Sequence, residues 1–207
     1  INETLEKAKE TLLSVSIHSI QRVQDLQVKT ASLSSGNQTL TNQLWRDALT
    51  GLYNRAYLDQ RLFQLFESAP PLSIIFCDVD HFKQINDRYG HAIGDQALIH
   101  VAETLQDNLR DNDLLGRYGG EEFLMLLPGA TLSQAQNVAE RCAEALRRNT
   151  MPIAGSPAIK LTASFGVSST GEASAIDAHT LIEEADRAMY TAKHQGRDRV
   201  VTYSRPQ

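Results

Sequence analysis

The chain has 207 residues, 42% of them hydrophobic, which is enough for one well-buried domain and an appendage but not for a second full domain. Its formal net charge is −5 and it contains no block of lysine and arginine, so composition gives no case for a protein that binds a nucleic acid polymer through its backbone. No apolar run approaches the roughly 20 residues that cross a bilayer, so we expect no membrane contact from this chain.

Cysteine usage and the first residue bear on cellular location. Cys77 and Cys142 both lie in apolar patterns, as reduced core thiols do, and this favours the cytoplasm. No signal peptide is visible. Because the chain begins with Ile1, we expect it to be part of a longer protein with an upstream sensor domain, which could itself be membrane-anchored.

Residues 1–46 predict a dimerising coiled coil. Leucines recur at seven-residue spacing, with Ser19 in the one gap, as at the d positions of a heptad repeat. The a positions are largely polar, and Asn37 is best suited to fix the register of a parallel dimer. Residues 34–36, Ser-Ser-Gly, should weaken or break the helix. The alternative is a single amphipathic helix docked on an upstream domain. The leucines of the ladder are Leu5, Leu12, Leu26, Leu33 and Leu40.

Residues 47–205 predict one α/β domain. An amphipathic helix around residues 58–66 ends at two prolines, and the near-continuous apolar run 72–79 is typical of a strand buried on both faces. A helix over 98–109 follows, and then a hairpin over 114–127.

The second half of this domain repeats the alternation of helix and strand. Thr131 and Gln134 predict a capping box that opens a helix, and residues 161–167 alternate as a half-buried strand does. Asp177 can cap the last helix, and residues 200–203 close the sheet. The core order is βαββαβ, which predicts a ferredoxin-like sandwich with a sheet containing antiparallel strands, flanked by helices.

The hairpin carries Gly119-Gly120-Glu121-Glu122 at its tip. We expect a two-residue Gly-Gly loop, because glycine reaches the required backbone angles without steric cost. A bare backbone also lets a nucleotide approach while the carboxylates hold a cation. The alternative is a solvated hairpin with two surface glutamates.

Asp78-Val79-Asp80 stands at the carboxyl end of the first buried strand, where ligands usually bind in α/β sheets. The predicted topology places this strand beside the hairpin, so Asp78 and Glu121 can share a hard cation such as Mg²⁺. The alternative is a turn or a helix cap.

Three stretches together resemble the GGDEF family of diguanylate cyclases. They are Asp-Ala-Leu-Thr-Gly-Leu-Tyr-Asn-Arg at 47–55, Phe-Cys-Asp-Val-Asp-His-Phe-Lys-Gln-Ile-Asn-Asp-Arg-Tyr-Gly-His-Ala-Ile-Gly-Asp at 76–95 and Arg-Tyr-Gly-Gly-Glu-Glu-Phe at 117–123. The resemblance covers residues 47–203 and implies a catalytic domain of the nucleotide-cyclase or palm type. The third position of the motif is glutamate rather than aspartate, which keeps the acid.

The resemblance implies a catalytic metal site for Mg²⁺ or Mn²⁺. Asp78, the carbonyl of Val79 and Glu121 match the metal ligands, and Glu121 also matches the residue tied to activation of the attacking hydroxyl. Glu122 matches a second acid near the metals.

Substrate positions follow from the same resemblance. Asn86 and Asp95 match the guanine readers, and an amide with a carboxylate would discriminate against adenine. Without the resemblance, Lys193 and Arg197 would be read as a solvated helix end. The further substrate-binding positions are His81, Phe82, Lys83, Gly119, Gly120, Lys193 and Arg197.

The reaction implied joins two GTP into cyclic di-GMP and releases two pyrophosphates, at two identical sites that face each other in a homodimer formed through the N-terminal helix. Arg110 and Asp113 match an Arg-x-x-Asp product-inhibition site, and Arg141 resembles its secondary arginine. Without the resemblance, Arg110 and Asp113 would be interpreted as a surface ion pair. Two alternatives are a non-catalytic GGDEF module that binds GTP or cyclic di-GMP, and a dimerising adaptor that idles until its sensor rearranges the helix.

Overall fold

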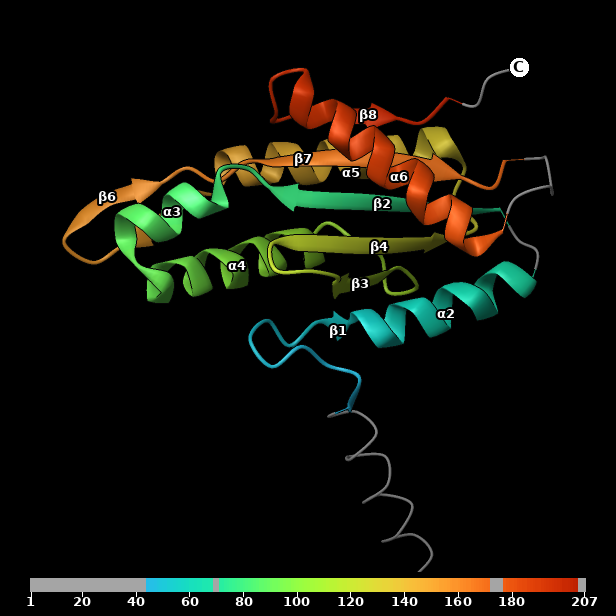
Figure 1. The fold of residues 1–207 in the computed structure, drawn as a ribbon, viewed down its shortest axis with the longest axis horizontal. Helices are drawn as coiled ribbons and strands as arrows, with labels where there is room; N and C mark the ends of the chain where they lie inside the picture. Colours follow the sequence, from blue (N-terminus) through green and yellow to red (C-terminus); the bar gives the residue numbers. More distant parts are fainter. Residues whose placement is uncertain (1–43, 69–70, 172–176, 205–207) are drawn as a thin grey trace, which may run out of the picture. The chain divides into compact units, whose positions relative to one another are not determined.

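The computed structural model describes residues 44–68, 71–171 and 177–204 (Figure 1). The chain divides into two units, of which the second, Trp45–Gln207, contains the described sheet and helices. The coiled-coil prediction falls on residues 1–43, outside the described part, and stays a prediction. Across the described ranges, none of the helices is both long and apolar enough to span a bilayer.

A six-stranded mixed sheet forms the centre of the domain. The strand order is β1-β3-β4-β2-β7-β8, and β2 is antiparallel to both of its neighbours, β4 and β7. Every residue of β2 is buried, as its continuous apolar run predicts. The strands are β1 Tyr53–Asn54, β2 Leu72–Val79, β3 Leu114–Arg117, β4 Glu122–Pro128, β7 Ala163–Ser169 and β8 Val200–Thr202, with a separate hairpin of β5 Met151–Ile153 and β6 Ser156–Ile159.

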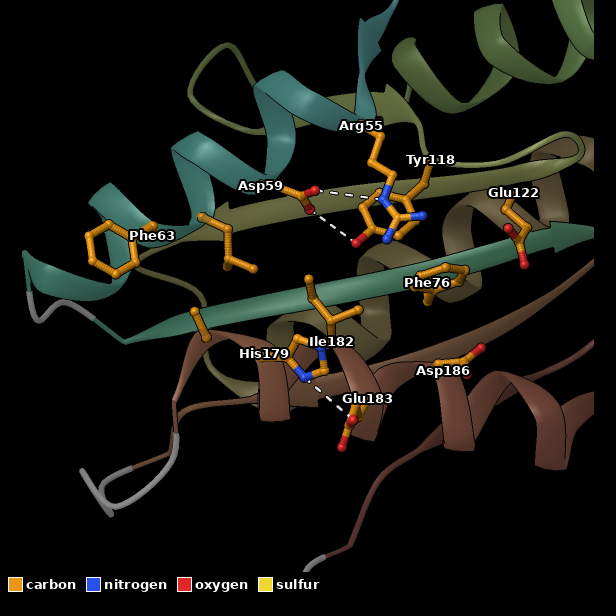
Figure 2. A pocket seen from close by; sticks show the side chains of 12 residues that line it. Arg55, Asp59, Phe63, Phe76, Tyr118, Glu122, His179, Ile182, Glu183 and Asp186 are labelled. Atoms are coloured by element: carbon orange, nitrogen blue, oxygen red, sulfur yellow. Dashed lines mark hydrogen bonds and ion pairs between the residues drawn. The ribbon is translucent and has the colours of Figure 1, made fainter.

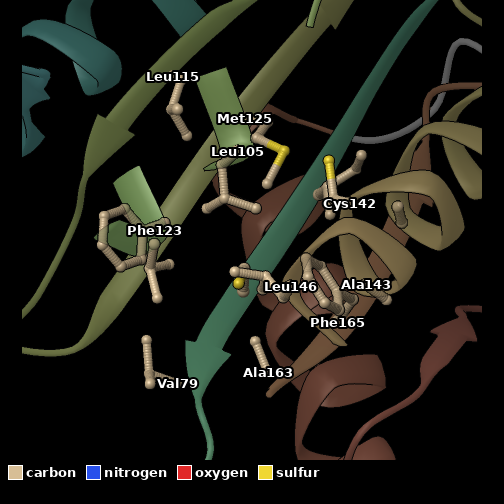
Figure 3. Close-up of a cluster of buried hydrophobic side chains, with 14 of the residues drawn as sticks. Val79, Leu105, Leu115, Phe123, Met125, Cys142, Ala143, Leu146, Ala163 and Phe165 are labelled. Atoms are coloured by element: carbon tan, nitrogen blue, oxygen red, sulfur yellow. The ribbon is translucent and has the colours of Figure 1, made fainter. Parts of the chain in front are cut away.

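Helices cover both faces of the sheet. The helices are α2 Arg55–Glu67, α3 Phe82–Tyr89, α4 His91–Gln106, α5 Leu132–Arg148 and α6 Ala178–His194. On one face, α2 and α6 pack with β2 and β4 and border a pocket (Figure 2). On the other face, α4 and α5 enclose a larger apolar core, of which Figure 3 shows a part. The order β2-α4-β3-β4-α5-β7, with β2 between β4 and β7, confirms the predicted ferredoxin-like βαββαβ core.

Side-chain caps fix the starts of three helices. Thr131 and Gln134 form the predicted capping box of α5, and Asp177 accepts from the Thr180 N–H at the start of α6. Asn54 caps α2 by accepting from the Tyr57 N–H, which was not anticipated from the sequence. The two cysteines are free and buried, as expected.

The prediction of a half-buried strand at residues 161–167 is wrong. All residues of β7 except the last are buried, because α6 covers the face that carries its small residues. Ser168 donates to the Leu181 carbonyl of α6, and a Cβ on Gly166 would overlap the α6 backbone at Ala185 and Met189. The polar and glycine positions of the alternation therefore mark a close helix contact and not solvent.

Candidate active site

The loop between β3 and β4 is longer than the two-residue turn expected from the sequence. Residues 118–121 connect the strands, and the N–H groups of Tyr118 and Gly119 both donate to the Glu122 carbonyl. Neither Gly119 nor Gly120 adopts a left-handed backbone, so the turn does not require them for that reason. A Cβ on Gly119 would overlap the Glu122 carboxylate, whereas a Cβ on Gly120 would meet open space. The bare backbone at Gly120 therefore serves neither the turn nor packing inside the domain.

The antiparallel pairing of β2 with β4 brings the acids together. Asp78 lies opposite Glu122 in the ladder, and the Val79 N–H donates to the Glu121 carbonyl at 3.1 Å. Asp78 is 4% exposed, and Lys193 of α6 forms an ion pair with it at 2.7 Å between Nζ and Oδ2. The carboxyl end of β2, the start of β4 and one lysine of α6 thus converge at one edge of the sheet.

The surroundings of this cluster disfavour the ionised form of its carboxyl groups. Burial raises the pKa of Asp78, which the charges of Lys193 and Arg197 partly counter. Burial also raises the pKa of Glu121 and of Glu122, and the Asp78 carboxylate raises both further. A divalent cation placed among these groups would relieve their mutual repulsion.

The donor set fits a hard cation that shares its coordination with a ligand. Among residues 44–68, 71–171 and 177–204, no three His, Cys, Asp or Glu side chains are arranged to hold an ion by themselves. The predicted ligands, which are Asp78, Glu121 and the Val79 carbonyl, would supply fewer protein ligands than a closed site has. Mg²⁺ characteristically binds through one or two carboxylates and takes its remaining ligands from phosphates and water.

Arg117 connects the hairpin to the entrance of the domain. Its guanidinium donates to the Gly120 carbonyl at 2.6 Å from Nη2 and 3.2 Å from Nε, and it lies 3.3 Å from the Asp47 carboxylate. Asp47 also accepts from the N–H and hydroxyl of Thr50. Arg117 lies in the third motif of the sequence, but no role was predicted for it.

The predicted guanine readers lie on neighbouring helices. Asn86 is half-buried on α3, and its side-chain oxygen sits against Gly94 of α4, where a Cβ would overlap it. Asp95 is the next residue on α4 and is exposed. The contact between α3 and α4 therefore brings these two positions close together.

The residues that follow β2 differ in what they can offer a ligand. Lys83 and His81 are exposed, and His81 has a left-handed backbone with φ 58° at the start of α3. Phe82 is buried in the core, so its contribution to a ligand would come from its backbone.

The last turn of α6 and the segment after it bring Lys193 and Arg197 to the same edge of the sheet. Lys193 pairs with Asp78, and the Arg197 side chain is exposed but close enough for its charge to lower the pKa of that buried carboxyl. Asp80 was left without a role by the sequence, yet its buried carboxylate accepts from the Asp198 N–H at 3.0 Å.

The three residues of the predicted inhibitory site also lie near one another. The Arg110 N–H donates to the Asp113 carboxylate at 3.0 Å, and the Asp113 N–H donates to the Arg110 carbonyl. Arg141 of α5 donates to the Asn108 carbonyl at 2.5 Å, just before this turn. Both guanidinium groups are on exposed residues.

A pocket of about 520 Å³ lies between α2 and α6, next to the acid cluster (Figure 2). Arg55 stacks over the Tyr118 ring at 4.5 Å and pairs with Asp59. Glu122 and Asp186 lie at the same end of the pocket, and the Asp186 charge raises the pKa of Glu122 beyond the effects of burial and of Asp78. Glu122 therefore lies at the boundary between the acid cluster and this pocket.

This fold and this site define the chain as an α/β domain of the nucleotide-cyclase type. A family model described as diguanylate cyclase, GGDEF domain, matches residues 44–199, and the chain belongs to this family.

Curated relatives also support membership of this family. The chain is 40% identical over 157 residues to diguanylate cyclase VdcA of Vibrio cholerae, covering 75% of this chain and 46% of that protein. It is 41% identical over 161 residues to response regulator PleD of Caulobacter vibrioides, covering 75% and 35%. The chain thus spans less than half the length of these relatives.

Two solved structures are similar to this chain. The coiled coil and GGDEF domain of DgcB from Caulobacter crescentus, in complex with c-di-GMP, has a TM-score of 0.79 at 26% identity and covers 87% of this chain and 97% of that one. The active GGEEF domain of a diguanylate cyclase from Vibrio cholerae has a TM-score of 0.68 at 31% identity and covers 74% and 98%.

Proposed function

We propose that this chain is a diguanylate cyclase that condenses two GTP molecules into cyclic di-GMP and two pyrophosphates. The observation that carries the proposal is the convergence of Asp78, Glu121 and Glu122 beside Gly120. The fold does not require a glycine at position 120, because a Cβ there would meet open space. Membership of the GGDEF family and the intact acids of the motif favour an enzyme over a binding module.

Mg²⁺, or Mn²⁺ in its place, is the proposed cofactor. Asp78, Glu121 and the Val79 carbonyl would hold it. When bound, the metal lowers the pKa of the attacking 3′-hydroxyl and neutralises charge on the α-phosphate. Glu121 is proposed to activate the hydroxyl, and Glu122 to act as a second acid near the reacting oxygen.

The proposed substrate contacts run from the guanine to the triphosphate. Asn86 and Asp95 read the base, because their acceptor and donor groups match guanine. Gly119 and Gly120 let the nucleotide approach the hairpin. The phosphate contacts come from Lys83, Lys193 and Arg197 and from the backbone at His81 and Phe82.

Each domain binds one GTP, so the reaction needs two domains face to face. The 3′-hydroxyl of one GTP attacks the α-phosphorus of the other and pyrophosphate leaves, and the same step in the opposite sense closes the ring. Dimerisation through residues 1–46 would hold the two sites near each other. The coiled coil in the DgcB structure supports this arrangement.

We also propose how the enzyme is regulated and where in the cell it acts. Arg110, Asp113 and Arg141 are proposed to bind the product and slow the enzyme, with the arginine forks taking a guanine edge or a phosphate. An upstream sensor would control the dimer. The free, buried cysteines favour the cytoplasm, where reduced thiols persist.

The test is a chromatographic assay of the purified chain with GTP and Mg²⁺ at several protein concentrations. We expect cyclic di-GMP, with a specific rate that rises with protein concentration and slows as product accumulates. A chain that binds GTP or cyclic di-GMP but forms no product at any concentration would instead be the non-catalytic module.

A further inference from the structure

The segment that follows α6 holds an unusual backbone. Arg197 has φ 61° and Asp198 has φ 48°, so two consecutive residues with side chains lie in the left-handed region. Such conformations are unfavourable for residues other than glycine and persist where the surroundings hold them. The side chain whose direction this backbone sets is that of Arg197, the proposed phosphate contact.

Asp80 holds this segment from the sheet side. Its carboxylate is 5% exposed and accepts from the Asp198 N–H at 3.0 Å. The same carboxylate accepts from the hydroxyls of Thr162 at 2.8 Å and Ser164 at 2.7 Å. Three donors converge on one buried acid, which fixes the Asp198 backbone relative to the end of β2.

Arg147 of α5 holds the same residue from the other side. Its Nε donates to the Asp198 carboxylate at 2.8 Å and its Nη2 to the Asp198 carbonyl at 3.0 Å. One guanidinium fork therefore binds both the side chain and the main chain of Asp198. A lysine has no second donor in this fixed geometry.

We infer that Arg147 and Asp80 are positioning residues that clamp Asp198 and thereby aim Arg197 at the triphosphate of GTP. The inference rests on the proposed function. Without the Arg147 fork, Asp198 can relax from its left-handed backbone, and the Arg197 guanidinium loses its fixed direction. A phosphate contact that is equal in the ground state and the transition state changes KM and leaves kcat unchanged.

The experiment compares Arg147→Met with Arg148→Met. Arg148 is the next residue of α5 and pairs with Glu144 at 2.8 Å, as Arg147 does at 3.1 Å, but it is 76% exposed and makes no contact with Asp198. R147M should raise the KM for GTP about three- to tenfold with kcat nearly unchanged, whereas R148M should match the parent chain. R147K should restore only part of the lost affinity.

A double-substitution cycle shows whether Arg147 acts through Arg197. If it does, R147M adds nothing to the KM already raised by Arg197→Ala. An equal effect of R147M in both backgrounds would overturn the inference.

The cycle also separates this inference from the proposed function. If R197A raises KM while R147M does not, the clamp is disproved and the cyclase proposal stands. If R197A leaves KM unchanged, the proposed phosphate role of Arg197 and the inference both fail. Similar unfolding temperatures for R147M and R148M would support a positioning role, and a collapse of R147M alone would show that the residue serves the fold.

Discussion

Asp78, Glu121 and Glu122 are close together and partly buried; burial raises the pKa of each carboxyl, and the charge of Asp78 raises the pKa of Glu121 and of Glu122 further. A carboxyl whose pKa is raised on folding binds protons more tightly in the folded state than in the unfolded state. The folded state therefore loses stability from these groups as the pH rises through their pKa values and regains it as the pH falls. Stability and activity place opposite demands on these residues.

Glu121→Gln should expose this conflict. In metal-free buffer at about pH 8 we expect its unfolding temperature to exceed that of the parent by about 1–3 °C, because one of three repelling charges is gone. The difference should shrink as the pH approaches 4.5, the ordinary pKa of glutamate, where the parent carboxyls take up protons. Calorimetry along a pH series measures this difference in unfolding temperature. The cyclase assay should show that E121Q has lost about 100-fold or more of the activity of the parent.

A lower unfolding temperature for E121Q at about pH 8 would contradict the repulsion argument. Added Mg²⁺ with GTP provides the control. It should stabilise the parent and have little effect on E121Q if Glu121 is a metal ligand.

At the scale of elements, the contact between β7 and α6 depends on the absence of one side chain. Gly166→Ala should cost about 3 kcal/mol of unfolding free energy or more, because its Cβ would overlap helix backbone that has no cheap way to move. Gly120→Ala is the matched control. It should leave the urea midpoint unchanged and still weaken GTP binding, since open space surrounds Gly120. Equal midpoints for the two variants would disprove this account of Gly166.

The sequence predicted those elements whose cause is local. The caps at Thr131 and Asp177 depend on residues three positions apart, and both were found. The length of the hairpin loop was missed because it depends on pairing across the sheet, where Arg117 lies opposite Phe123. Burial of β7 on both faces was missed because α6 lies later in the chain.

The same distinction applies to the site. The adjacency of Asp78 to the hairpin acids follows from the order of strands and was predicted from it. The contact of Arg147 with Asp198 joins residues 51 apart and leaves no periodic pattern. Such a pair becomes visible only when the helix and the segment after α6 are seen together.

At the scale of the whole molecule, the prediction concerns removal of residues 1–43. The unit Trp45–Gln207 contains its own sheet and cores, and Trp45 and Arg46 belong to it through contacts with Tyr57 and Tyr53. We therefore expect a chain that begins at Leu44 to fold and to bind GTP.

At low protein concentration, the specific cyclase activity of the chain that begins at Leu44 should be about tenfold or more below that of the parent chain, and it should recover as the concentration rises. The reason is that the proposed dimerising helix no longer holds one active site at a high local concentration near the other. Rate measurements over a dilution series, with sedimentation on the same samples, test this. Equal specific activities for the two chains at every dilution would remove the case for a dimerising helix.

The ion pair between Lys193 and Asp78 bears on the order in which ligands arrive. If Asp78 binds a divalent ion as proposed, the ion competes with the Lys193 ammonium group for this carboxylate. A displaced ammonium then lacks a counter-ion until a triphosphate supplies one. The buried charges of the site stay balanced only if the metal and the nucleotide bind together. On the proposed mechanism we therefore expect Mg²⁺ to bind weakly to the enzyme without nucleotide and to bind together with GTP.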